Sequence, residues 1–126
     1  MNDSSGLTRI HVDISLFAER DAFGRISGCV EVAVVPQIGD TVGLDLLAAP
    51  VGPEAITGSS LVRVESRRIP VNGEGEIAVN LSDISVRTRD DALRVMAFLQ
   101  DRYDLFGEPF RDEDLQAMKQ IEEERG

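Results

Sequence analysis

The sequence contains one cysteine and one histidine, so the residue types that build most zinc and thiol redox sites are nearly absent. Cys29 alone can form neither an internal disulfide nor a multi-cysteine zinc site. With His11 as its only histidine, the chain would have to build a closed zinc site almost wholly from carboxylates, which is rare. We therefore expect no metal and no cofactor.

Long apolar runs and an excess of basic residues are missing as well. The apolar run at 46–51 is far shorter than the roughly 20 residues that a membrane-spanning helix needs. The polar N-terminus lacks the basic and then apolar pattern of a secretory signal. With 13 basic and 23 acidic residues the net charge is −10, and an acidic surface repels nucleic-acid phosphates. These features predict a cytoplasmic protein with no nucleic-acid or membrane partner.

The length of 126 residues suffices for one domain with its own core, but not for two. We expect residues 1–6 to be disordered and 7–126 to form a single domain. This domain would consist of a sheet or barrel over 7–87 and a helical tail over 88–126.

Apolar and polar residues alternate along the first two thirds of the chain, which is typical of half-buried strands. The alternation predicts five strands, at 10–16, 30–34, 42–46, 61–69 and 76–81. Prolines, glycines and serines at 49–60 predict a long surface loop, and Asn72-Gly73 predicts a tight hairpin turn between the last two strands.

The apolar spacing becomes helical after the last predicted strand. Thr88 is a good N-cap, and the residues behind it predict a helix over 89–103. A break at 104–109 precedes a second helix, predicted from Asp112 to about Glu123, with a narrow apolar stripe.

These elements predict an α+β fold. We expect a five- or six-stranded, strongly bent antiparallel sheet or a small barrel, followed by two C-terminal helices. The segment Gly39-Asp40-Thr41-Val42 resembles the starts of strands in small SH3-like barrels, a likeness that implies no function.

Catalytic patterns are absent from the sequence. His11, Asp13 and Ser15 alternate on one strand face, but successive same-face residues are separated by about 6.6 Å of strand, whereas a base must lie within about 3.2 Å of its nucleophile. Neither a Gly-x-Ser-x-Gly elbow nor a glycine-rich phosphate loop is present. We name no catalytic residue, and we lean against an enzyme.

Two features could serve recognition. Arg63 and Arg67 are predicted to share a strand face, where they could bind a carboxylate or a phosphate, or pair with acids across the sheet. The second feature is the C-terminal region, since 88–126 carries six basic and eleven acidic residues, a net charge of −5. Its candidate interaction residues are Phe106, Phe110, Asp112, Glu113, Asp114, Glu122 and Glu123.

The charge distribution favours a non-enzymatic interaction domain whose acidic helical end contacts a basic partner protein. One alternative is a small-molecule-binding or catalytic small barrel with a site near the 49–60 loop, Arg63 and Arg67. Another is a structural subunit that self-associates into a homo-oligomer through an exposed strand edge or its final helix.

Overall fold

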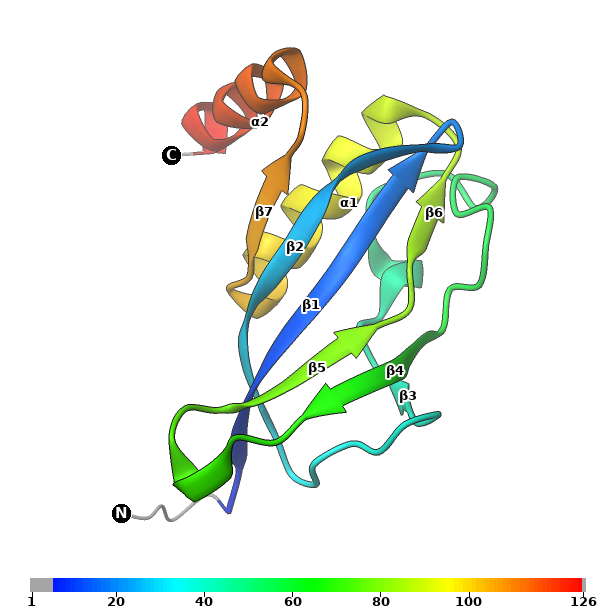
Figure 1. Cartoon of the computed structure of the whole chain (residues 1–126). Coiled ribbons are helices and arrows are strands. Elements are labelled where there is room, and N and C mark those ends of the chain that lie inside the picture. The colour runs from blue at the N-terminus through cyan, green and yellow to red at the C-terminus, as the bar shows by residue number, and fades with distance from the viewer. Residues whose placement is uncertain (1–5, 126) are drawn as a thin grey trace.

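The computed structural model describes residues 6–125, so the predicted disordered segment 1–6 lies outside the described part of the chain except for Gly6. This part contains seven strands, two α-helices and two short 3-10 turns (Figure 1). The strands are β1 (Thr8–Ala18), β2 (Asp21–Val32), β3 (Thr41–Val42), β4 (Val62–Arg68), β5 (Ile77–Leu81), β6 (Ile84–Val86) and β7 (Phe106–Pro109). The helices are α1 (Arg89–Tyr103) and α2 (Asp112–Arg125), and the 3-10 turns are η1 (Leu46–Ala48) and η2 (Val71–Gly73).

The strands form one open, mixed sheet in the order β3-β4-β5-β1-β2-β7, with β6 pairing with β1 beyond the end of β5. The long antiparallel hairpin of β1 and β2 lies between β5 and β7. Because β5 and β6 both run parallel to β1, the sheet is not antiparallel throughout. The predicted bent antiparallel sheet or SH3-like barrel is therefore wrong: the central hairpin separates the two edge strands, β3 and β7, which do not pair.

Glycine explains why the alternation concealed most of β2, which begins at Asp21 rather than at 30. Gly24 lies opposite Pro109 of β7, and a Cβ on Gly24 would lie 2.6 Å from the carbonyl oxygen of Glu108. The strand predicted at 42–46 is also shorter than expected, since β3 covers only Thr41–Val42 and the 3-10 turn η1 follows. The predicted break at 104–109 contains the edge strand β7.

The C-terminal helices confirm the prediction. The α1 helix spans Arg89–Tyr103, and the Thr88 hydroxyl accepts a hydrogen bond from the Asp91 N–H at 3.0 Å, as an N-cap does. The antiparallel pairing of β4 with β5 forms, but the predicted tight turn between them does not. The last pair joins Arg68 to Ala78, and Asn72 and Gly73, at φ values of 65° and 70°, lie in the 3-10 turn η2 of the longer loop between them.

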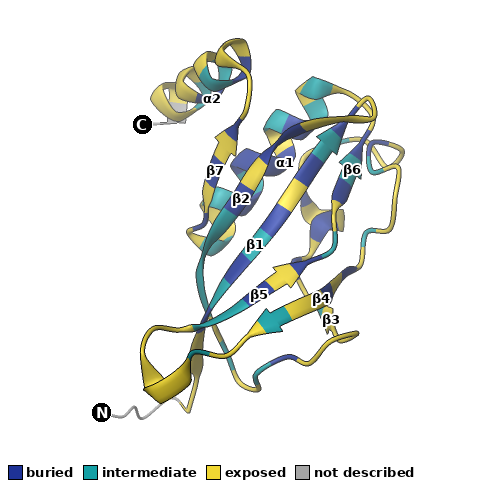
Figure 2. Cartoon of the chain, in the orientation of Figure 1, coloured by how far each residue is buried: buried dark blue, intermediate teal, exposed yellow. Residues whose placement is uncertain are grey.

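The core lies between one face of the sheet and α1. Alternate residues of β1 from Ile10 to Ala18 are buried against the inner stripe of α1, which includes Val95 and Leu99 (Figure 2). The predicted loop at 49–60 is anchored on the same side, since Ala49 and Ala55 are buried and the Thr57 N–H donates to Ser85. The opposite face of the sheet bears no helix within the described residues.

Candidate interaction site

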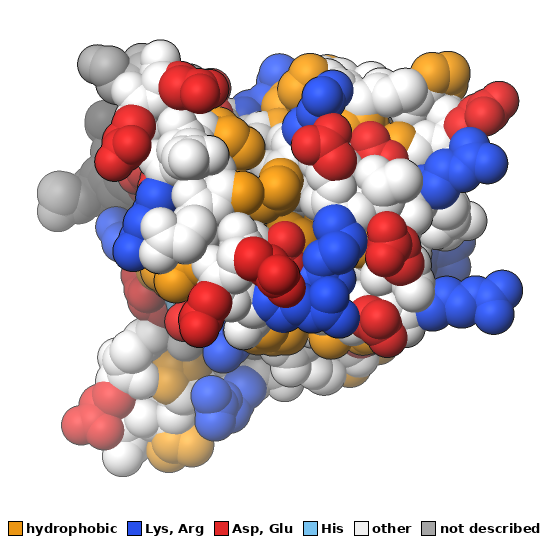
Figure 3. Space-filling model, turned by 90° about the horizontal axis from the view of Figure 1, so that it is seen from above, with side chains coloured by type: hydrophobic (Ala, Val, Ile, Leu, Met, Phe, Trp, Pro, Cys, Tyr) orange, Lys and Arg blue, Asp and Glu red, His pale blue; other side chains and the backbone are white. Residues whose placement is uncertain are grey.

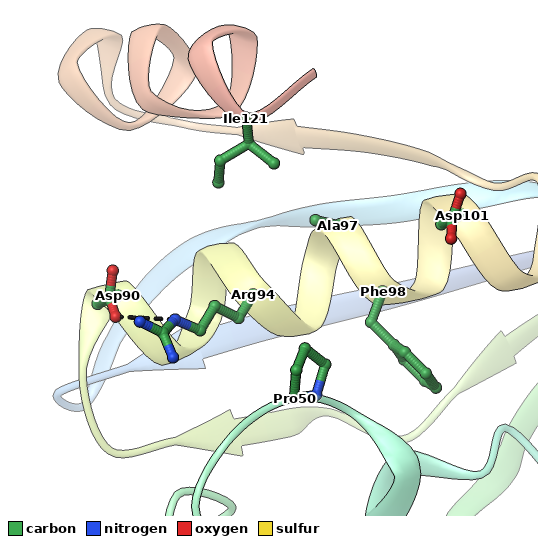
Figure 4. A pocket seen from close by; sticks show the side chains of 7 residues that line it. All are labelled: Pro50, Asp90, Arg94, Ala97, Phe98, Asp101 and Ile121. Atoms are coloured by element: carbon green, nitrogen blue, oxygen red, sulfur yellow. Dashed lines mark ion pairs between the residues drawn. The ribbon is translucent and has the colours of Figure 1, made fainter. Parts of the chain in front are cut away.

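A groove runs along the outer stripe of α1. Its floor is formed by five residues of α1. The last four follow Asp90 by four, seven, eight and eleven positions, which places all five on one side of the helix. One wall is the α2 helix and the other is the loop that follows η1. The cavity has a volume of about 540 Å³ and is lined by Asp90, Arg94, Ala97, Phe98, Asp101, Ile121 and Pro50 (Figure 4).

The middle of the groove is apolar and its ends are charged. Ile121 points from α2 toward Ala97 on α1, and Phe98 lies beside Pro50 (Figure 4). At one end Arg94 Nε lies 3.1 Å from an Asp90 carboxylate oxygen. Seen from above, apolar side chains occupy the middle of the molecular surface, with acidic and basic side chains around them (Figure 3). Such a surface can take an apolar side chain flanked by charge.

The wall formed by α2 is held by a buried ion pair. Asp114, in the first turn of α2, is 6% exposed and forms a salt bridge with Arg89 in the first turn of α1. The Arg89 guanidinium also lies over the Phe23 ring, 5.0 Å from its centroid. The hydrogen bond with Asp114 raises the pKa of Arg89, so this side chain stays charged. Met118, one turn further along, is buried against the core.

Asp114 was predicted to contact a partner, and the structure gives it a different place. Its carboxylate is occupied by Arg89 and turned into the protein, so its visible role is to fix α2 against α1. The other acidic candidates on α2 remain exposed, namely Asp112, Glu113, Glu122 and Glu123.

The aromatic candidates are exposed but lie away from the groove. Phe106 and Phe110 are 65% and 57% exposed. Phe106 pairs with Ser27 of β2, whereas the neighbouring Gly107 packs against Met96 of α1. Because side chains alternate along a strand, Phe106 and Phe110 face the side of the sheet opposite to α1.

The β7 edge offers little to an added strand. The Phe110 N–H donates to the Phe23 carbonyl of β2 at 2.9 Å. Because backbone groups alternate in direction along an edge strand, the residues whose backbone groups point away from the sheet are Gly107 and Pro109. The Gly107 N–H is taken by the Gln100 side chain at 2.7 Å, and proline has no N–H. Self-association by strand addition at this edge therefore lacks its usual hydrogen-bond donors.

The predicted basic surface of Arg63 and Arg67 is not formed. A β-bulge between Val64 and Ser66 reverses the alternation and places Arg67 opposite the buried Val79. The Arg67 guanidinium donates to the Pro36 carbonyl at 3.2 Å, while Arg63 stays exposed beside β3. The 49–60 loop encloses a cavity of about 160 Å³ lined by neither arginine. The loop and the two arginines therefore do not share this cavity, and the small-molecule alternative stays a prediction.

The sequence indicated only one side of the groove. The helical pattern of α1 was clear, and its outer stripe could have been read from the same spacing. Nothing local indicated that Pro50 and Ile121, which are far apart in the chain, would form the walls.

Comparison with protein-family models, with curated proteins and with solved structures finds no match for this chain. No helix within residues 6–125 is long and apolar enough to cross a membrane. In the same part of the chain, no group of three or more histidine, cysteine or acidic side chains could hold a metal ion.

Proposed function

We propose that this chain is a non-enzymatic binding domain that recognises a basic segment of a partner protein. The groove between α1, α2 and Pro50 carries the proposal. An apolar side chain of the partner would fill the space between Ala97 and Ile121, and the basic residues on either side of it would face the acidic helical surface.

The charge of the helical region supports a basic partner. Residues 88–126 have a net charge of −5, and Arg94, the one arginine among the described residues that line the groove, is already paired with Asp90. Such a field increases the rate of encounter with basic segments and disfavours acidic ones, while a buried apolar anchor supplies affinity.

The dimensions of the groove suit a short segment. Its floor extends from Asp90 to Asp101, a separation of eleven positions along the helix, or about 16 Å at 1.5 Å per residue. An extended chain of about five residues covers the same length. One central apolar residue with two neighbours on each side is therefore the minimal epitope.

Synthetic peptides test this proposal directly. The probe is a fluorescent peptide of about five to nine residues with a central leucine and flanking lysines and arginines. Two matched peptides replace the leucine by alanine or the basic residues by glutamate. We expect only the first to bind in an anisotropy titration, and its affinity should fall as salt screens the charges.

Filling the groove should abolish this binding. Ala97→Met extends a side chain into the cavity, and Ala33→Met makes the same change at an exposed loop position as the control. Equal binding of the leucine and alanine peptides, or equal binding by the two variants, would refute the proposal. A second copy of this chain is the rival occupant of the groove, and sedimentation of the protein alone tests for it. A dimer that Ala97→Met disrupts and Ala33→Met leaves intact would assign the groove to a second copy.

A further inference from the structure

The face of the sheet opposite α1 contains a polar hollow of about 460 Å³, distinct from the groove. Side chains of four neighbouring strands, β1, β2, β4 and β5, line it. Nothing within the described residues covers this face with a helix, and the β1 residues that line the hollow, His11 and Asp13, are among those that the alternation of β1 turns away from the core.

The strand register explains why this surface is hollowed. Ala78 on β5 lies directly opposite Arg68 on β4 and opposite His11 on β1. Its methyl group forms a low floor between two long side chains, whose strands are about 10 Å apart. Asn80, two residues further along β5, lies opposite Ser66 and Asp13 and forms the next row.

The acids around the hollow already have basic partners. Arg25 Nε donates to an Asp13 carboxylate oxygen at 2.7 Å, and a second contact joins the same two groups. Glu76, at the start of β5, lies 2.7 Å from Arg9 Nε and accepts from the Cys29 thiol at 3.0 Å. These pairs cancel their own charges, so neither acid neutralises Arg68.

Two side chains of the hollow have no such partner. Neither Arg68 nor His11 makes a side-chain hydrogen bond or ion pair with any other residue in the described part of the chain. Asn80 Nδ2 donates to Ser66 Oγ at 2.8 Å. This bond does not use the hydroxyl proton of Ser66 or the amide oxygen of Asn80, so one donor and one acceptor remain for a ligand. Arg67 lines the hollow as well, but it lies opposite the buried Val79 and its guanidinium donates to the Pro36 carbonyl at 3.2 Å. Arg68 is therefore the cation that the hollow offers to a ligand, together with neutral donors and acceptors.

We propose that this hollow binds a small organic monocarboxylate that also carries a hydroxyl group. The guanidinium of Arg68 matches the two oxygens of a carboxylate in a bidentate fork. A single charge fits because, among the described arginines that line the hollow, Arg25 is paired with Asp13 and Arg67 donates to the Pro36 carbonyl from its place opposite the buried Val79, which leaves Arg68. The hydroxyl group can then bond to Ser66, Asn80 or His11 above the floor of Ala78.

A titration with lactate, observed through backbone amide resonances, tests the site. We expect saturable shifts centred on Ala78, His11 and Asn80. Arg68→Gln should weaken binding by about tenfold or more, as loss of a charge-assisted hydrogen-bond pair does. Arg63→Gln is the matched control, since Arg63 lies on the same strand, is exposed and has no side-chain ion pair with another described residue.

Three outcomes would overturn the proposal. The first is an absence of saturable shifts at Ala78 in the wild-type protein. The second is an equal loss in Arg63→Gln and Arg68→Gln, which would indicate general attraction of anions. The third is tighter binding of inorganic phosphate than of lactate, which would assign the hollow to a phosphate ligand. Ala97→Met should leave lactate binding unchanged, so this test and that of the groove can fail separately.

Discussion

Replacing Asp114 by asparagine should destabilise the protein by about 2–3 kcal/mol. The side chains of Asp114 and Arg89 are only 9% and 18% exposed, so the change leaves a largely buried guanidinium without its counter-charge. Breaking a fully buried pair costs about 3–5 kcal/mol. The expected loss of about 2–3 kcal/mol is smaller because Arg89 keeps some contact with water and asparagine can still accept one hydrogen bond. Arg89 also lies at the N-terminus of α1, where the helix dipole disfavours an uncompensated cation.

An exposed pair in the same protein provides the control. Arg87 and Glu54 are joined at 3.2 Å, but their side chains are 62% and 83% exposed. Water and salt screen such a pair, so Glu54→Gln should cost no more than about 0.5 kcal/mol. Both substitutions exchange a carboxylate for an amide of the same shape, and they differ mainly in burial.

Urea denaturation followed by circular dichroism measures both free energies, and thermal unfolding should show a drop of about 8–10 °C for Asp114→Asn. The double variant Arg89→Met/Asp114→Leu should recover part of the loss, since it removes both buried charges. If Asp114→Asn and Glu54→Gln have the same stability, the ion pair does not hold α2 in place and the reasoning fails.

Two further predictions concern a close approach and an ionised group. Gly24→Ala should cost about 2 kcal/mol or more in urea denaturation, because the new Cβ would lie 2.6 Å from the Glu108 carbonyl oxygen; Gly43→Ala, with no atom within 4 Å, should change stability by less than about 1 kcal/mol. The free-energy difference between wild type and Arg89→Gln should be equal at about pH 7 and pH 9. Hydrogen bonding to Asp114 raises the pKa of Arg89, so its stabilisation is present below the unfolded pKa and is lost only as pH rises through the still higher folded pKa. A difference that falls between these two pH values would contradict this assignment.

Local patterns predicted the helices correctly and the sheet incorrectly, because helix signals depend on chain neighbours and strand pairing depends on distant residues. The N-cap at Thr88 and the spacing behind it depend only on neighbours in the chain, and α1 begins and ends where they indicate. The start of β2 was missed because Gly24 and Gly28 interrupt its alternation. Gly24 is required by the approach of β7, a strand more than 80 residues away.

The candidate sites show the same limit. The sequence correctly placed acids on α2, but it could not distinguish Asp114, which is buried, from Asp112 and Glu113, which are exposed. It also placed Arg63 and Arg67 on one face, and a single bulge separated them. Burial depends on which segment packs on top, and the alternation of a strand continues only where its register does.

The sequence by itself determined the α+β composition, the two C-terminal helices with the N-cap of the first, and the concentration of acidic residues in the helical region. These properties depend on residue type and short-range spacing, over which hydrogen bonds and helix dipoles act. Only the tertiary structure decided that the sheet is open and mixed, that α2 and Pro50 enclose a groove on α1, and that Ala78 lies between Arg68 and His11. These arrangements join residues distant in the chain, and they follow from strand register and packing, which a one-dimensional pattern does not encode.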